Sequence, residues 1–222
     1  QVTCRFHGLG LHNAGGTVED VGIRDVRHEP LSAAVSGAGL YLHNEDGVSR
    51  SITVSNSTFS GFQKNGLALR ASDATPLLVD IRDNQIEGAG VLTYDDGDPV
   101  QNGIEVWADR GTGSIAGNTI RGIAYDNTND SERYVASSIL NLYADLDVTG
   151  NSVSGGHVGL YIVGGAAQIR DNTFEIDKVG VAGYGILARG ERMGDGTPDT
   201  DRTDRMESFG LGMFASDPPD AV

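Results

Sequence analysis

The chain has 222 residues, of which 38% are apolar and 6% are aromatic. Its formal net charge of −15 argues against a nucleic-acid partner, because an acid excess repels phosphates. No apolar run is long enough to span a bilayer, and the lone Cys4 excludes an intrachain disulfide and a cysteine-based zinc site.

The predicted elements are short strands that repeat along the chain. The 32 glycines have no collagen period, which indicates many tight turns between strands. Nearest the N-terminus, the degenerate copy VGIRDVRHE places Val21 and Val26 in two apolar positions. Five regular copies follow, and they start at Ile52, Val79, Gly113, Leu146 and Ala167.

The five regular copies share one pattern of apolar and polar positions. The first apolar position holds Val54, Ile81, Ile115, Val148 and Ile169. Three residues later the chain has Ser57, Asn84, Asn118, Asn151 and Asn172. Two residues further on, the second apolar position holds Phe59, Ile86, Ile120, Val153 and Phe174. Asparagine at a recurrent position is typical of a turn, where its side chain caps backbone groups, so in-register copies predict an asparagine ladder.

Each copy is accompanied by a second short strand with alternating apolar residues, as in GAGLYLHN or HVGLYIVG. This alternation is the period of a half-buried strand. The residues expected to point inward are Leu40 and Leu42, Leu67 and Leu69, Ile104 and Val106, and Leu160 and Ile162. The copies are spaced unevenly, with the excess in loops, as solenoids allow.

The repeat predicts an all-β parallel β-helix of about six coils. One coil cannot bury its inward side chains alone, but coils stacked at a spacing of about 4.8 Å enclose an apolar column. Leucine-rich repeats are the alternative, but the pattern lacks their leucine spacing and any helical segment. We expect the β-helix over residues 1–192 and an acidic tail over 193–222. That tail is either a solvated linker or a cap on the last coil through Phe209, Leu211, Met213 and Phe214.

The segments NSTF, NTI, NSV and NTF, followed by GL, GI or GLYI, resemble the repeats of the pectate-lyase-like superfamily between Val18 and Gly190. The resemblance implies a right-handed coil. The superfamily includes polysaccharide lyases, polygalacturonase-like hydrolases, mannuronan epimerases, phage tailspikes and noncatalytic surface proteins. The segments Gly156-His157-Val158 and Ile169-Arg170 match two of the hydrolase motifs, Gly-His-Gly and Arg-Ile-Lys, only in part. The Asp-Pro-His motif of the epimerases is absent. The resemblance therefore assigns no catalytic residue.

If the second strands stack in register, their outward residues form two columns on one face. The first column is Tyr41, Ala68, Glu105, Asn141, Tyr161 and Leu187. The second column is His43, Arg70, Trp107, Tyr143, Val163 and Arg189. Aromatic rings stack on sugar faces, and arginines and carboxylates bind hydroxyl and uronate groups, so this mixture predicts a groove for a polysaccharide.

Roles follow from the chemistry of such a groove. A uronate lyase needs a cation near the substrate carboxylate and a base for the C5 proton, which Arg70, His43 and Tyr143 can supply, with Glu105 as acid or metal ligand. The residues expected to bind substrate are Trp107, Asn141, Tyr161, Tyr41 and Arg189. The alternative is that outward aromatic residues cover a neighbouring loop.

Two acidic loops, Tyr94–Asp98 and Tyr125–Asp130, are expected to leave adjacent coils at similar points. Their oxygen ligands suit Ca²⁺, although the same residues are common in ordinary turns. The candidate metal ligands are Asp95, Asp96, Asp98, Asp126 and Asp130.

Two functions remain open from the sequence. The first, which is the preferred interpretation, is an extracellular or cell-surface lyase or hydrolase acting on a polymeric glycan. The second is a noncatalytic surface or adhesion module that binds carbohydrate, which the acidic charge favours because it repels polyanionic substrates. The chain begins at Gln1 without an initiator methionine, so we also expect a mature or excised piece of a longer protein.

Overall fold

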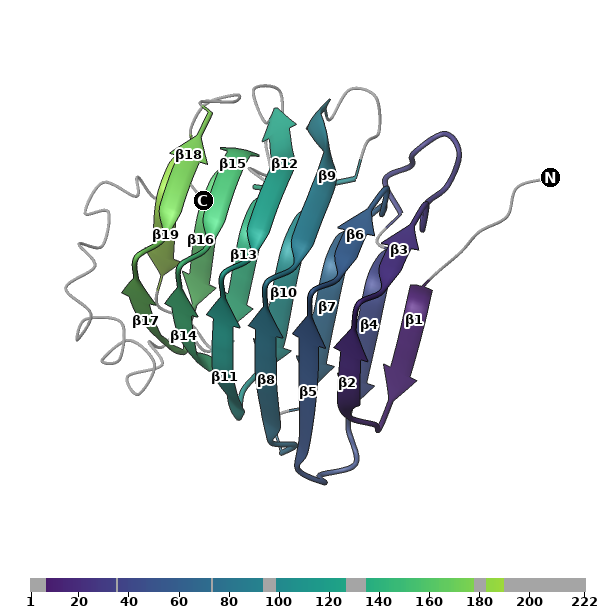
Figure 1. Cartoon of the computed structure of the whole chain (residues 1–222), viewed down its shortest axis with the longest axis vertical. Coiled ribbons are helices and arrows are strands. Elements are labelled where there is room, and N and C mark those ends of the chain that lie inside the picture. The colour runs from purple at the N-terminus through teal and green to yellow at the C-terminus, as the bar shows by residue number, and fades with distance from the viewer. Residues whose placement is uncertain are drawn as a thin grey trace, which may run out of the picture.

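The computed structural model describes residues 7–34, 36–72, 74–93, 99–126, 135–177 and 183–189, and its regular elements there are β-strands wound into a stack of coils (Figure 1). Sheet A contains, in spatial order, β1 (His7–His12), β4 (Ala38–Asn44), β7 (Asn65–Ala71), β10 (Asn102–Ala108), β13 (Ser137–Leu142), β16 (Val158–Val163) and β19 (Tyr184–Arg189). Sheet B contains β2 (Gly16–Glu19), β5 (Arg50–Ser55), β8 (Leu77–Arg82), β11 (Gly111–Ala116), β14 (Asp145–Thr149) and β17 (Ala166–Arg170). Sheet C contains β3 (Gly22–Arg24), β6 (Thr58–Ser60), β9 (Gln85–Thr93), β12 (Thr119–Asp126), β15 (Ser152–Gly156) and β18 (Thr173–Ile176).

Each coil takes one strand from each sheet, in the order A, B, C, so the described residues form six coils and then β19. The strand pairs are parallel, as in β4 with β7 and β5 with β8. The predicted parallel β-helix of about six coils is therefore confirmed. In the described ranges no helix has the length and apolar character of a membrane span. The tail over 193–222 and its four proposed capping residues lie outside the described residues.

The core is the predicted pile of aliphatic side chains. Val54, Ile81, Ile115, Val148 and Ile169 are register partners from β5 to β17. The first four are fully buried, as are Leu40, Leu67, Ile104 and Leu160 on the facing sheet A. Stacking therefore removes from water the side chains that no coil encloses alone, which is the dominant favourable term in folding.

The predicted apolar positions of the first copy are wrong. Val18 pairs with Val54, and Ile23 pairs with Phe59, so these residues hold the two apolar positions in place of Val21 and Val26. Val21 instead lies at the position of the ladder asparagines and is 37% exposed. The spacing of five residues between the apolar positions is preserved, and the copy simply begins three residues earlier than expected.

The corner between sheets B and C is built alike in every coil, with two residues between the strands. The first corner residue has a positive φ in each coil; these residues are Asp20, Asn56, Asp83, Gly117, Gly150 and Asp171, with φ between 49° and 65°. Glycine, asparagine and aspartate tolerate this left-handed conformation best, which explains why the sequence has only these types there. The second corner residue is the ladder position.

The ladder asparagines join each coil to its neighbours. Asn118 Nδ2 donates to the Ile81 carbonyl at 3.0 Å and to Asn151 Oδ1 at 3.0 Å, while Asn118 Oδ1 accepts from the backbone and side-chain nitrogens of Asn84. Asn84, Asn151 and Asn172 bind the Val54, Ile115 and Val148 carbonyls in the same way. The predicted ladder is therefore confirmed, and its side chains form hydrogen bonds with buried backbone groups beside the apolar column.

Replacing Asn118 with alanine should destabilise the chain by about 2–4 kcal/mol, because it leaves several buried backbone and amide groups unpaired. Asn172→Ala is the matched control. Asn172 occupies the last rung, is partly exposed and has a ladder partner on one side, so its loss should cost about 1 kcal/mol. Urea denaturation followed by circular dichroism measures both. Equal losses for the two variants would contradict a cooperative ladder.

Candidate functional site

The outer face of sheet A gathers aromatic and charged side chains from neighbouring coils. Register pairing gives two columns across the strands. One is Gly10, Tyr41, Ala68, Glu105, Leu140, Tyr161 and Leu187. The other is His12, His43, Arg70, Trp107, Leu142, Val163 and Arg189. The polar and aromatic members lie toward β1, β4, β7 and β10, and the columns become mainly apolar from β13 onward.

The predicted places of Asn141 and Tyr143 in these columns are wrong by one residue. Leu140 pairs with Glu105, and Leu142 pairs with Trp107, which turns the buried Asn141 toward the inside beside Val106. Asn141 caps the following turn: its Nδ2 donates to the Ala144 carbonyl at 2.9 Å, and its Oδ1 accepts from Ala144 N at 3.2 Å. Tyr143 lies in that turn with φ of 72°. This strand lacks the glycine that precedes the aligned residues in other coils, so the alignment by sequence slipped.

Arg70 and Glu105 form an ion pair at the centre of the face. Glu105 Oε1 accepts from Arg70 Nε at 2.6 Å and also lies 2.6 Å from Arg70 Nη2, and Glu105 Oε2 accepts from Asn65 Nδ2 at 2.7 Å. Glu105 is 3% exposed. A carboxylate this deeply buried needs such partners, because desolvation of an unpaired charge is costly. Both carboxylate oxygens are therefore already engaged.

Aromatic rings flank the Arg70 guanidinium on both sides. Its carbon lies 5.3 Å from the centroid of the Trp107 ring and 5.9 Å from that of Tyr41, which is within the range of cation–π attraction. His7 stacks on Tyr41 with centroids 4.4 Å apart and planes 9° from parallel. Burial lowers the pKa of His7, which favours its neutral form in this stack. Trp107 is 43% exposed, so part of its side chain is accessible to a ligand.

Lys64 is a further charged residue near this pair, and the sequence analysis did not select it. It lies just before β7, and its Nζ donates to the Val100 carbonyl. Burial lowers the pKa of the Lys64 amine; the Glu105 carboxylate opposes this shift and Arg70 adds to it. The one available signal was its rarity, since the chain has two lysines.

The structure brings together Tyr41, His43, Arg70, Glu105 and Trp107 on three adjacent strands. Tyr161 lies on β16, two strands beyond Glu105, and Arg189 lies at the end of β19 as the partner of Val163. These five residues therefore cluster on β4, β7 and β10, in the half of sheet A nearer β1. Tyr161 and Arg189 lie outside that compact cluster.

The predicted calcium ligands fall mainly outside the described residues, which applies to Asp95, Asp96, Asp98 and Asp130. Asp126 is described: it ends β12, pairs in register with Thr93 of β9 and is partly exposed. Calcium binding stays a prediction.

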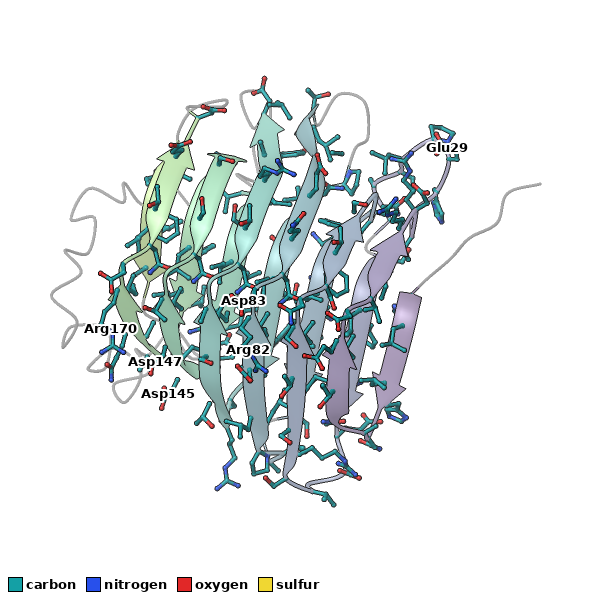
Figure 2. All side chains as sticks on the ribbon, viewed as in Figure 1. Glu29, Arg82, Asp83, Asp145, Asp147 and Arg170 are labelled. Carbon is teal, nitrogen blue, oxygen red and sulfur yellow. The ribbon has the colours of Figure 1, made fainter. Side chains whose placement is uncertain are left out.

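A concave surface that the sequence did not predict lies on sheet B. It has a volume of about 650 Å³ and is lined by residues of β8, β11, β14 and β17. Its acidic residues have local partners: Asp80 pairs with Arg82, Asp147 lies 3.9 Å from Arg170, and Asp145 Oδ1 accepts from Ala166 N. Figure 2 shows Asp145, Asp147 and Arg170 together on the outer side of this sheet. It offers no aromatic ring, so sheet A is the better candidate for ligand stacking.

The comparisons with known proteins agree with this architecture. No curated protein and no solved structure matches the chain. A family model described as right handed beta helix region matches residues 7–193, which is most of the chain and includes every coil described above. The protein therefore belongs to the right-handed β-helix family.

Proposed function

We propose that the outer face of sheet A binds a glycan, with Trp107 as the ring on which a sugar stacks. The observation that carries this proposal is the half-exposed indole held by the Arg70 guanidinium at 5.3 Å beside the stacked Tyr41 and His7 rings. A rigid aromatic platform bordered by polar groups is what sugar rings require, because their C–H faces are apolar and their edges carry hydroxyls.

The charge balance of this face favours a neutral glycan. Glu105 already offsets the positive charge of Arg70, so this ion pair has no net positive charge to attract a uronate carboxylate. The net charge of −15 adds repulsion toward polyanions. We also propose that the protein acts outside the cell or on its surface, where such glycans are found.

The same contacts favour binding without turnover. A general acid or nucleophile has to reach the scissile bond, whereas Glu105 is buried and both of its oxygens accept hydrogen bonds from Arg70 and Asn65. The noncatalytic surface module is therefore the function that this geometry supports best.

A uronate lyase is the second candidate, and Lys64 favours it. A lysine whose pKa is lowered by burial can act as a base below the ordinary value of 10.5, and Arg70 lies close enough to contribute to that lowering. In this interpretation Lys64 would take the C5 proton of a uronate, and Arg70 would have to exchange its pairing with Glu105 for the uronate carboxylate.

Trp107→Ala should weaken glycan binding at least about tenfold, because the stacking ring and its apolar contact are lost. Trp107→Phe keeps a ring and should retain part of the affinity. Leu78→Ala, which removes an exposed apolar side chain from sheet B, is the control and should bind as the unaltered protein does. A glycan array identifies the ligand and calorimetry measures affinity. Unchanged binding by Trp107→Ala, or a blank array, would refute the proposal.

Glu105→Gln should destabilise the chain by about 1–3 kcal/mol, because it leaves Arg70 without a counterion and places its amide NH2 group against the donor of either Arg70 or Asn65. Glu87→Gln is the control, since Glu87 is 60% exposed and lies 3.9 Å from Arg121 in a surface pair whose contribution should be near zero. Thermal unfolding compares the two. Unchanged stability of Glu105→Gln would contradict a stabilising role of the Glu105 carboxylate in the fold.

The lyase candidate predicts unsaturated products from a polyuronate, detected by their ultraviolet absorbance. The rate should rise with pH and level off below pH 10.5, because the neutral amine of Lys64 is the active form. Lys64→Met should abolish the product while the protein stays folded by circular dichroism. No product from the unaltered chain, or an active Lys64→Met variant, would exclude this candidate.

A further inference from the structure

We propose that His12, His43 and Glu45 form a binding site for a divalent transition-metal ion, with Zn²⁺ as the representative ion. The site lies at the end of strands β1 and β4, on the first two coils. It does not depend on the proposed glycan binding and involves none of the predicted calcium ligands.

The fold places the two histidines side by side. His12 and His43 are register partners in parallel strands, so their backbones are about 4.8 Å apart and both rings leave the same face of sheet A. Their ring centroids are 6.1 Å apart. Glu45 follows two residues after His43 and approaches His12, with 2.9 Å between His12 Nε2 and Glu45 Oε1.

The turns that carry these side chains are joined to each other. Asn13 N donates to the His43 carbonyl at 2.9 Å, Asn13 Oδ1 accepts from Glu45 N at 2.8 Å, and Asn44 Oδ1 accepts from Ala14 N at 2.9 Å. Asn13 has φ of 47°, which asparagine tolerates well. The backbone positions of the three ligands are therefore fixed relative to one another before any ion binds.

The donor atoms are close enough for one ion. One ligand atom from each of the three residues lies within 4.8 Å of the other two. Bonds of about 2.0–2.1 Å in a tetrahedral site separate ligand atoms by roughly 3.3 Å, which modest side-chain rotations reach here. Three protein ligands leave a fourth position open to water.

The donor set decides the class of ion. Two imidazoles and one carboxylate suit Zn²⁺ and its transition-metal neighbours, whereas Ca²⁺ prefers six to eight oxygen ligands. The nearby charges do not oppose an ion: Arg70, the register partner of His43, is paired with Glu105, and Asp46 is paired with Arg50 at 2.5 Å. His12 and Glu45 are largely exposed, so an ion can enter from solvent.

The test is calorimetric titration of metal-free full chain with Zn²⁺, repeated with Co²⁺ to record the visible absorption of a tetrahedral site. We expect one ion per chain, and at least about tenfold weaker binding in His43→Ala and in His12→Ala. His28→Ala is the matched control, because His28 binds Ser32 Oγ away from this site and its loss should leave the affinity unchanged.

Two further measurements keep the result interpretable. Zn²⁺ should raise the unfolding temperature of the unaltered chain and of His28→Ala, but not that of His12→Ala, whose exposed ring can be removed without disturbing the core. A large excess of Ca²⁺ should not displace the Zn²⁺. No stoichiometric binding, or binding that is unchanged in both His12→Ala and His43→Ala, would overturn the proposal, whatever the glycan array shows.

Discussion

The stack depends on the hydrogen bonds that hold each coil in register with the next. A single coil of this chain cannot enclose its own aliphatic side chains, so burial and register have to be achieved together. The asparagine ladder couples the two: Asn118 binds the carbonyl of Ile81, itself a member of the buried column, and also the side chains of the asparagines above and below. A shift of register by one residue would break the ladder and expose the column at once.

The candidate sites inherit their precision from that register. Tyr41, Arg70 and Trp107 are far apart in the sequence, yet each lies one strand from the next, which places the guanidinium between two rings. The same rule puts His12 beside His43. Because these side chains lie on strands and not on a long loop, the conformational entropy of ordering them is lost when the chain folds and not when a ligand binds.

The sequence predicted the features that recur in every coil, but not the features that are particular to one coil. The apolar pile through Val54 and Val148 and the ladder asparagines could be predicted, because burial and corner geometry impose the same residue types in every coil. The assignment failed at the first copy, where Val18 and Ile23 replace Val21 and Val26, and at β13, where the missing glycine hid the register of Leu140. The pairing of Glu105 with Arg70 and Asn65, and the position of Lys64 near them, arise from contacts between coils that no pattern within one coil encodes.

Because the corner between sheets B and C has the same geometry in every coil, a whole coil can be removed or inserted at this corner. Every such corner has two residues, begins with a left-handed backbone and ends at the ladder position or its equivalent, whereas the connection from sheet C back to sheet A varies from one residue, between β15 and β16, to thirteen, between β3 and β4. Excising residues 117–149 would bring Gly150-Asn151 to the place of Gly117-Asn118 with the same backbone geometry on both sides of the splice. Such a fold can be lengthened or shortened by whole coils. The connection length varies most between sheets C and A and less between sheets A and B, where two to five residues join the strands.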